Sequence, residues 1–273
     1  MTRLAAILNR LWRIPMTGFC FALFGLGGVL LSVIWFNLLS LVIRDKQTRR
    51  RYARRSISAC FRFFLAVVRF VGVLDYRIEG EEILQQESGC LVVANHPSLI
   101  DYVMIASVMP ETDCLVKSTL LKNPFVSGPI RAADYLINSQ SETLLSQSQQ
   151  RLDRGDTILI FPEGTRTRPG EEMTLQRGAA NIAVRCAKDL RIVTIHCTEH
   201  FLSKQSKWYD APPSRPLFTI KVGERVRIDR FYEAETQEPA LAARQLNRHL
   251  LQQLQSVEIS IAGLNDASAL SRN

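Results

Sequence analysis

The chain has 273 residues, 47% of them apolar, and a formal net charge of +8. This length allows one large domain with an appendage, and the apolar share is enough for a full core. The positive charge points to an anionic partner, either membrane lipid or nucleic acid. The six cysteines form no CxxC pair, which argues against a zinc site and favours small buried side chains in a reducing compartment.

A long apolar segment lies near the start of the chain. Residues 17–43 carry no charge and would form a helix of about 40 Å, against a hydrocarbon core of about 30 Å. No small-residue cleavage site follows, so the segment predicts a retained membrane anchor rather than a signal peptide. Gly25, Gly27 and Gly28 leave two interpretations open, a spanning helix and a re-entrant hairpin.

A dense basic run follows the apolar segment. Beside such a segment it favours contact with anionic lipid headgroups over DNA, with a solvated linker as the alternative. The charge bias places the domain that follows on the cytoplasmic side of the membrane. Residues 56–74 predict an interfacial helix, or equally an amphipathic helix packed on the domain. The run consists of Arg44, Lys46, Arg49, Arg50, Arg51, Arg54 and Arg55.

The rest of the chain predicts an α/β domain over residues 75–257. Its strands and helices alternate, which indicates a mostly parallel sheet flanked by helices, with antiparallel strands possible near the C-terminal half. Residues 1–74 would form the membrane anchor with its basic linker, and residues 258–273 a disordered polar tail. Strands are expected at 75–80, 90–94, 157–161, 191–197, 217–222 and 225–228, and helices from Pro97 and at 141–153, 176–188 and 239–256.

The string NHPSLID at 95–101 follows one of the apolar strands. Pro97 suits the first position of a helix, with His96 near its cap and Asp101 in the second turn. From there Asp101 could reach one imidazole nitrogen of His96 and orient it as a general base. Because the chain has no GxSxG elbow, the nucleophile would be the hydroxyl of the substrate itself. The alternative is that His96 caps the helix and Asp101 pairs with an arginine.

The string FPEGTR at 161–166 ends a second apolar strand. Gly164 allows a tight turn that exposes backbone N–H groups, and Arg166 offers a planar fork for a phosphate. Glu163 could bind a substrate hydroxyl or orient Arg166. A plain charged turn is the alternative.

NHPSLID and FPEGTR together resemble the NHxxxxD block and the phosphate-binding block of the glycerolipid acyltransferases. The nearest type is the lysophosphatidic acid acyltransferase, which makes phosphatidic acid. The helix that starts with RGAA at 177–180 also resembles that group, and the resemblance covers about residues 75–225.

This resemblance implies an acyl thioester donor, acyl-CoA or acyl-carrier protein, and a glycerol-based hydroxyl acceptor. It implies no cofactor, no metal and no nucleic acid, and a setting at the cytoplasmic side of a bacterial inner membrane. His96 would be the general base and Asp101 its orienter. The residues that would bind the acceptor phosphate are Glu163, Gly164, Thr165, Arg166 and Lys117.

Two segments depart from the family pattern. In the middle block, Asn138 and Ser139 stand where an Asp-Arg pair is usual, and Arg131 falls too early to replace it. Thr194 stands where a later strand usually carries a proline. These departures motivate an alternative, in which a specialised acyl chain moves from a carrier protein to a different lipid. A non-catalytic lipid-binding protein and a hydrolase are further alternatives.

His196 and His200 are of a residue type that binds metal ions. In an extended strand they would share a face but lie about 13 Å apart, too far to bind one ion. The sequence therefore predicts no metal site there.

Overall fold

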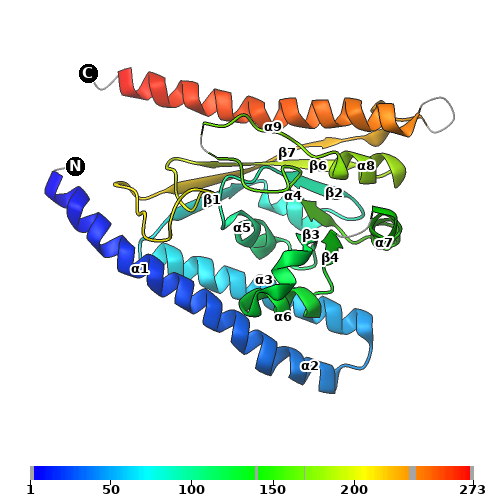
Figure 1. Cartoon of the computed structure of the whole chain (residues 1–273), viewed down its shortest axis with the longest axis horizontal. Coiled ribbons are helices and arrows are strands. Elements are labelled where there is room, and N and C mark those ends of the chain that lie inside the picture. The colour runs from blue at the N-terminus through cyan, green and yellow to red at the C-terminus, as the bar shows by residue number, and fades with distance from the viewer. Residues whose placement is uncertain (1–2, 139–140, 169, 234–237, 271–273) are drawn as a thin grey trace.

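The computed structural model describes residues 3–138, 141–168, 170–233 and 238–270. The chain begins with one long helix, made of α1 (Arg3–Leu30), a π-helical turn (Leu31–Trp35) and α2 (Phe36–Val42). After a short turn, α3 (Lys46–Phe70) runs back along it, so that the N-terminal region is a helical hairpin on one side of the molecule (Figure 1).

A seven-stranded sheet forms the centre of the domain, in the order β1-β7-β6-β2-β5-β3-β4. All neighbouring strands are parallel except β6 and β7. This confirms the predicted α/β class and its mostly parallel sheet. The strands are β1 (Asp75–Glu79), β2 (Leu91–Ala94), β3 (Asp113–Lys117), β4 (Leu136–Asn138), β5 (Ile158–Ile160), β6 (Leu190–Cys197) and β7 (Leu217–Val226).

Helices cover both faces of the sheet, with α9 on one side and the α1–α3 hairpin on the other (Figure 1). Successive side chains of β2 alternate between two cores: Leu91 and Val93 join α8 and α9, whereas Val92 and Ala94 join α3 and α5. The remaining helices are α4 (Glu81–Gln86), α5 (Asp101–Val108), α6 (Pro124–Ala132), α7 (Ser141–Asp153), α8 (Gly178–Arg185) and α9 (Pro239–Leu270), with 3-10 turns at Ser118–Lys122 and Ile228–Arg230.

Several predicted boundaries differ from the structure. The runs at 217–222 and 225–228 are one strand, β7, and the short strands β3 and β4 were not predicted. The last helix continues to Leu270, so residues 258–270 extend α9 where a disordered tail was expected. Positions 271–273 lie outside the described residues.

The apolar N-terminal segment forms no hairpin within itself. Within the part of the chain that the structure describes, Ile7–Val42 is the one helix long and apolar enough to cross a membrane, with a mean hydropathy of 2.3. Two of its glycines, Gly25 and Gly28, pack against α6. A Cβ on Gly25 would lie 3.3 Å from the Phe125 ring, and one on Gly28 would collide with the Phe125 carbonyl oxygen. These glycines therefore allow two helices to approach closely rather than making a bend.

Helix α3 is amphipathic and packs on the domain, as the second interpretation of residues 56–74 expected. Its buried side chains include Ile57, Leu65 and Val68. Part of the basic run is held by the protein itself. Arg54 is 3% exposed and pairs with the fully buried Asp113 at 2.6 Å, and Arg50 pairs with Asp156 at 2.7 Å. The run is therefore only partly available to lipid headgroups.

Candidate active site

The site lies where the parallel strands β2 and β5 end. Because neighbouring parallel strands have their carboxyl ends at the same edge of a sheet, the loops after them meet there. The register of β2 with β5 pairs Val93 with Ile160, so NHPSLID and FPEGTR leave the sheet side by side. Asn95 fixes the first loop to β6, since its amide donates to the Ile195 carbonyl at 2.8 Å and accepts from the Ile195 N–H at 2.6 Å.

His96 and Asp101 form the predicted pair. The imidazole Nδ1 lies 2.8 Å from Asp101 Oδ2, and the Asp101 side chain is fully buried. Phe161, the residue after β5, stacks on the imidazole with ring centroids 4.4 Å apart. The His96 side chain remains 21% exposed. The pair therefore leaves Nε2 as the imidazole nitrogen able to take a proton from a substrate.

The local structure around Asp101 corrects the predicted helix start. Pro97 is not helical and α5 begins at Asp101, so Asp101 lies in the first turn rather than the second. Ser98 lies three residues before this start and contacts Asp101. Its backbone N–H donates to Asp101 Oδ2 at 2.7 Å, its hydroxyl donates to Asp101 Oδ1, and its Oγ accepts from the Ile100 N–H at 3.3 Å. These hydrogen bonds fix the carboxylate that orients His96.

Glu163 has a different place from the one predicted. It is 6% exposed; its Oε1 accepts from the His96 backbone N–H at 2.6 Å, and its Oε2 accepts from the Thr167 hydroxyl. Burial raises the pKa of Glu163, although these two hydrogen bonds and the nearby imidazole act against the rise. Glu163 therefore holds the loop of His96 in position, with each carboxylate oxygen accepting one of these hydrogen bonds.

Arg166 has the free donors that the sequence predicted. Its Nη1 donates to the carbonyl oxygens of Leu202 and Ser203, both at 3.0 Å, and within the described residues Nε and Nη2 have no partner. Partial burial lowers the pKa of Arg166, while the negative charge of Asp101 acts against this. The guanidinium therefore lies within electrostatic reach of the His96–Asp101 pair, with one edge fixed and the other open.

Gly164 makes the turn that carries Arg166. Its φ is +68°, and a Cβ there would lie 2.5 Å from the Gln176 amide nitrogen, so a side chain fits neither the backbone nor the space. Thr165 is exposed on this turn. In the described part of the chain, the backbone N–H groups of Thr165 and Arg166 have no hydrogen-bond partner. The turn thus presents two backbone donors beside the open edge of the guanidinium.

The middle block contributes less than expected. Lys117 ends β3 and is exposed at the same edge of the sheet, but β5 separates its strand from β2. Arg131 is exposed on α6, Asn138 ends β4, and Ser139 lies outside the described residues. No contact joins Lys117 or Arg131 to the His96–Asp101 pair among the residues that the structure describes.

The histidines of the later strand do not form a metal site. His196 lies in β6 with a buried Nε2 that has no partner in the described structure, and burial lowers its pKa. His200 is exposed beyond the end of the strand. Among the described residues, no group of three His, Cys, Asp or Glu side chains could hold a metal ion.

An apolar cavity adjoins the catalytic loops. It is lined by α1 residues such as Cys20 and Phe24, by Leu99 and Ile100 of the NHPSLID loop, and by Leu202. Leu99 and Ile100 lie between Ser98 and Asp101, and the Leu202 carbonyl is a partner of Arg166. The helical hairpin therefore closes an apolar space directly beside the polar site.

Comparison with known proteins finds similarity to one enzyme family. Residues 75–198 match the Acyltransferase family model. The chain is 28% identical over 183 residues to a putative 1-acyl-sn-glycerol-3-phosphate acyltransferase, acl-2, of Caenorhabditis elegans, covering 60% of this chain and 64% of that protein. It is 29% identical over 168 residues to the 1-acyl-sn-glycerol-3-phosphate acyltransferase of Helicobacter pylori, covering 58% and 67%. The matched segments thus span about two-thirds or less of these relatives.

A solved structure has the same fold over nearly the whole chain. The crystal structure of the 1-acyl-sn-glycerophosphate acyltransferase PlsC of Thermotoga maritima superposes with a TM-score of 0.64 at 22% identity. The match covers 94% of this chain and 97% of that one, so it includes the N-terminal helices as well as the sheet. At this identity the similarity shows the fold and does not identify the substrate.

Proposed function

Because residues 75–198 are a domain of the acyltransferase family, we propose that this enzyme moves an acyl chain from a thioester donor to the free hydroxyl of a lysophosphatidic-acid-like glycerolipid. The donor would be acyl-CoA or acyl-carrier protein, and the product phosphatidic acid or a related lipid. The observation that carries the proposal is the His96–Asp101 pair at 2.8 Å beside the open edge of Arg166.

The proposed reaction begins with His96. Its Nε2 takes the proton of the acceptor hydroxyl while Asp101 stabilises the imidazolium that forms. The acceptor oxygen attacks the thioester carbonyl carbon, and a tetrahedral oxyanion results. Collapse of this intermediate breaks the carbon–sulfur bond, and the imidazolium returns its proton to the departing thiolate. No covalent acyl-enzyme is needed, in keeping with the absence of a GxSxG elbow from the sequence.

The acceptor phosphate would bind at the turn after β5. Arg166 offers Nε and Nη2 as two donors for a phosphate. The backbone N–H groups of Thr165 and Arg166 are further donors that suit an anion. Gly164 supports the turn, and Lys117 at the same sheet edge would add a more distant positive charge. The apolar cavity lined by Phe24, Ile100 and Leu202 has a volume of about 80 Å³ and would take the first few carbons of an acyl chain.

The protein would work at a membrane surface. The helix Ile7–Val42 packs on the domain through α3 and α6, yet only 11% of its most apolar window is buried. Its exposed side chains include Leu11, Val33 and Leu41. A helix that is apolar on its outer side and fixed to the domain on its inner side fits immersion in one leaflet. The bacterial inner membrane, with the site on its cytoplasmic side, is the proposed location.

Lipid mass spectrometry would test the proposal. Cells that express the wild-type chain or the His96→Ala variant would be compared, and purified protein would be assayed with lysophosphatidic acid and either acyl-CoA or acyl-carrier protein. We expect phosphatidic acid to accumulate with the wild type and to fall to background with the variant, which should fold and bind membranes normally. Full activity of His96→Ala would refute the mechanism, and fatty acid release without acceptor would indicate a hydrolase.

The same assay addresses the alternative acceptor. The altered middle block, with Asn138 exposed at the end of β4, is the observation that favours a different lipid. Turnover of a specialised acyl chain from carrier protein, with little turnover of lysophosphatidic acid, would support that alternative. Efficient use of lysophosphatidic acid with ordinary acyl-CoA would exclude it.

A further inference from the structure

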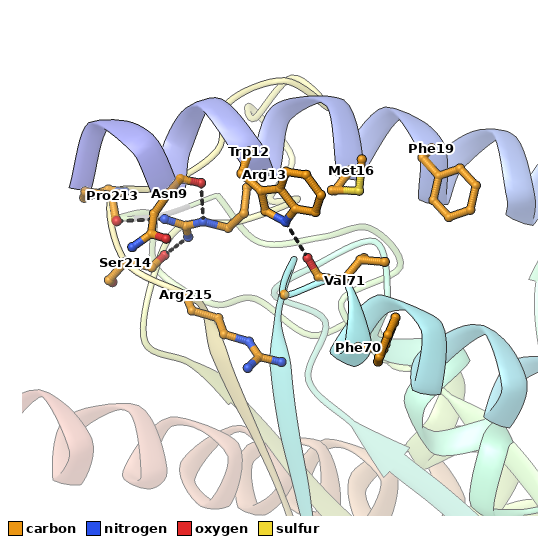
Figure 2. Close-up of a pocket in the computed structure, with 11 residues that line it drawn as sticks. Asn9, Trp12, Arg13, Met16, Phe19, Phe70, Val71, Pro213, Ser214 and Arg215 are labelled. Carbon is orange, nitrogen blue, oxygen red and sulfur yellow. Dashed lines mark hydrogen bonds between the residues drawn. The ribbon is translucent and has the colours of Figure 1, made fainter. Parts of the chain in front are cut away.

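A second cavity lies away from the catalytic loops, at the open end of the helical hairpin. Its volume is about 910 Å³, and it is formed by the N-terminal half of α1, the end of α3 and the loop before β7 (Figure 2). None of the residues of the NHPSLID or FPEGTR strings lines it. Its size is in the range of ligand sites, and the proposed reaction does not use it.

Two arginines give this cavity its charge. Arg13 and Arg215 line it, and no acidic side chain does. Asp75 lies 3.7 Å from Arg215 but also pairs with Arg69, and Glu199 accepts a hydrogen bond from the Ser214 hydroxyl. The lining itself therefore carries two positive charges and no negative one.

Both guanidinium groups are held in place by carbonyl oxygens. Arg13 is 4% exposed, and it donates to the carbonyls of Asn9, Pro213 and Ser214 (Figure 2). Arg215 donates through Nη2 to the carbonyls of Arg69 and Leu74. A guanidinium has five N–H donors, so each arginine keeps donors that these bonds do not use. Carbonyl oxygens orient the two cations, and Asp75, 3.7 Å from Arg215 and shared with Arg69, offsets only part of the charge.

The mouth of the cavity is aromatic and apolar. The Trp12 indole N–H donates to the Val71 carbonyl at 2.9 Å, and this bond ties α1 to the end of α3 (Figure 2). Trp12 is nevertheless 56% exposed, Phe19 is 48% exposed and Phe70 is 90% exposed. Aromatic side chains of this kind favour the boundary between headgroups and hydrocarbon. The mouth is also continuous with the exposed apolar side of α1.

From this combination we propose that the cavity binds one anionic phospholipid of the membrane. Its phosphate would contact Arg13 and Arg215, and the start of its acyl chains would lie along Met16, Phe19 and Phe70. This lipid is not the acyl acceptor, because the site lacks His96 and Arg166. It would fix the helical hairpin at one depth and orientation in the membrane. The inference rests on the proposed membrane association but not on the proposed reaction.

Vesicle binding of the full chain would test the inference. The wild type, the double variant Arg13→Gln with Arg215→Gln, and the control Arg62→Gln would be floated with vesicles of phosphatidylcholine containing 0 or 30% phosphatidylglycerol. Arg62 is an exposed residue of α3 that does not line the cavity. We expect the double variant to lose about 25-fold in affinity for the anionic vesicles, about fivefold for each arginine. Arg62→Gln should lose twofold or less.

A second measurement locates the lipid. A photoactivatable phosphatidylglycerol, present in trace amount in the same vesicles, should label peptides that contain Trp12, Phe70 or Ser214, and the double variant should lose this label. Equal losses for the double variant and Arg62→Gln, or labelling elsewhere, would overturn the site. Release by 10 mM inorganic phosphate would also overturn it, in favour of a simple anion site. If the double variant fails to fold, Arg215→Gln alone, with its expected fivefold loss, carries the test.

The two proposals fail in different ways. If the wild type does not bind vesicles of either composition, the proposed membrane association is wrong. If the wild type binds and turns over lysophosphatidic acid, but the double variant binds as tightly as Arg62→Gln, the lipid site alone is wrong.

Discussion

The loop after β2 and the basic run of α3 are both short strings rich in polar residues, but their charges have different surroundings. In the loop, Asp101 is fully buried and its partner His96 remains partly exposed, so the pair points its reactive nitrogen outward. In the basic run, Arg54 points inward and its partner Asp113 is fully buried. The first arrangement can act on a substrate, whereas the second can only join parts of the fold.

The buried carboxylates of the two regions sharpen this contrast. Asp113 has Arg54 and Arg151 beside it, and the Asp113 charge raises the pKa of Arg54 although burial works in the opposite direction. Glu163 is also buried, but no lysine or arginine lies within 4 Å of it in the described chain, and its partners are neutral donors. Removing a cation partner of Asp113 would leave a buried charge unpaired and destabilise the fold. A buried carboxylate without a cation partner, such as Glu163, is more typical of a functional site.

The largest effect is expected from Asp101→Asn. An amide at this position would hydrogen-bond Nδ1 in a way that favours the wrong imidazole tautomer, so Nε2 could no longer accept a proton. We expect kcat for acyl transfer to fall by about 10²–10⁴-fold. Steady-state assays with lysophosphatidic acid would measure it, with Asp153→Asn on the exposed side of α7 as the control. If Asp101→Asn kept full activity, Asp101 would have only a structural role, as Asp113 has.

Two adjacent arginines of the basic run allow a matched comparison of stability. Arg54 pairs with Asp113 in the interior, whereas Arg55 pairs with Glu111 at 2.5 Å with both side chains about half exposed. Arg54→Ala should lower the free energy of unfolding by about 3–5 kcal/mol, because it leaves a buried carboxylate short of a partner. Arg55→Ala should lower it by about 1 kcal/mol or less. Denaturant unfolding in detergent would compare them, and equal losses would contradict the assignment.

The sequence predicted the catalytic pair because its two members are close in the chain. His96 and Asp101 are five residues apart after an apolar strand, so local geometry brings them together. The hydrogen bonds from Ser98 to Asp101 were not predicted, although the two residues are only three positions apart. The stacking of Phe161 on His96 follows from the pairing of β2 with β5, which the sequence left open.

Contacts between distant segments could not be predicted in the same way. The His96 N–H and Glu163 are 67 residues apart, and whether Glu163 faces the substrate or the loop depends on the register of two strands. Arg54 looked like its neighbours in the basic run, and only the packing of α3 on β3 shows that it is buried. The strands β3 and β4 span five and three residues, too few for a clear pattern.

A smaller effect is expected from Arg166→Lys. A lysine keeps the positive charge, but it cannot hold the Leu202 and Ser203 carbonyls and offer a second pair of donors at once. We expect KM for lysophosphatidic acid to rise about tenfold, the worth of one charge-assisted hydrogen bond, with little change in kcat. Arg168→Lys is the control, because Arg168 forms an exposed pair with Glu171. A fall in kcat at unchanged KM would place Arg166 in the chemical step instead.

The smallest effect is expected from Glu163→Gln, on the pH dependence of the free energy of unfolding. This variant tests directly the buried carboxylate that has no cation partner. Burial raises the folded-state pKa of Glu163 above its ordinary value, so between these two values the folded protein binds more protons than the unfolded chain. The free energy of unfolding then falls as pH rises through this range. Glutamine keeps an acceptor for the His96 N–H and does not titrate.

Melting temperatures of the wild type and Glu163→Gln should therefore be compared from pH 4 to pH 8. Relative to the variant, the wild type should be most stable below the ordinary glutamate pKa of about 4.3 and should lose that advantage as pH rises through the folded-state pKa. A difference that stays constant with pH would mean that the pKa of Glu163 is not shifted. A wild type that gains stability with rising pH would mean that its hydrogen bonds from His96 and Thr167 outweigh burial, and that Glu163 resembles Asp113 after all.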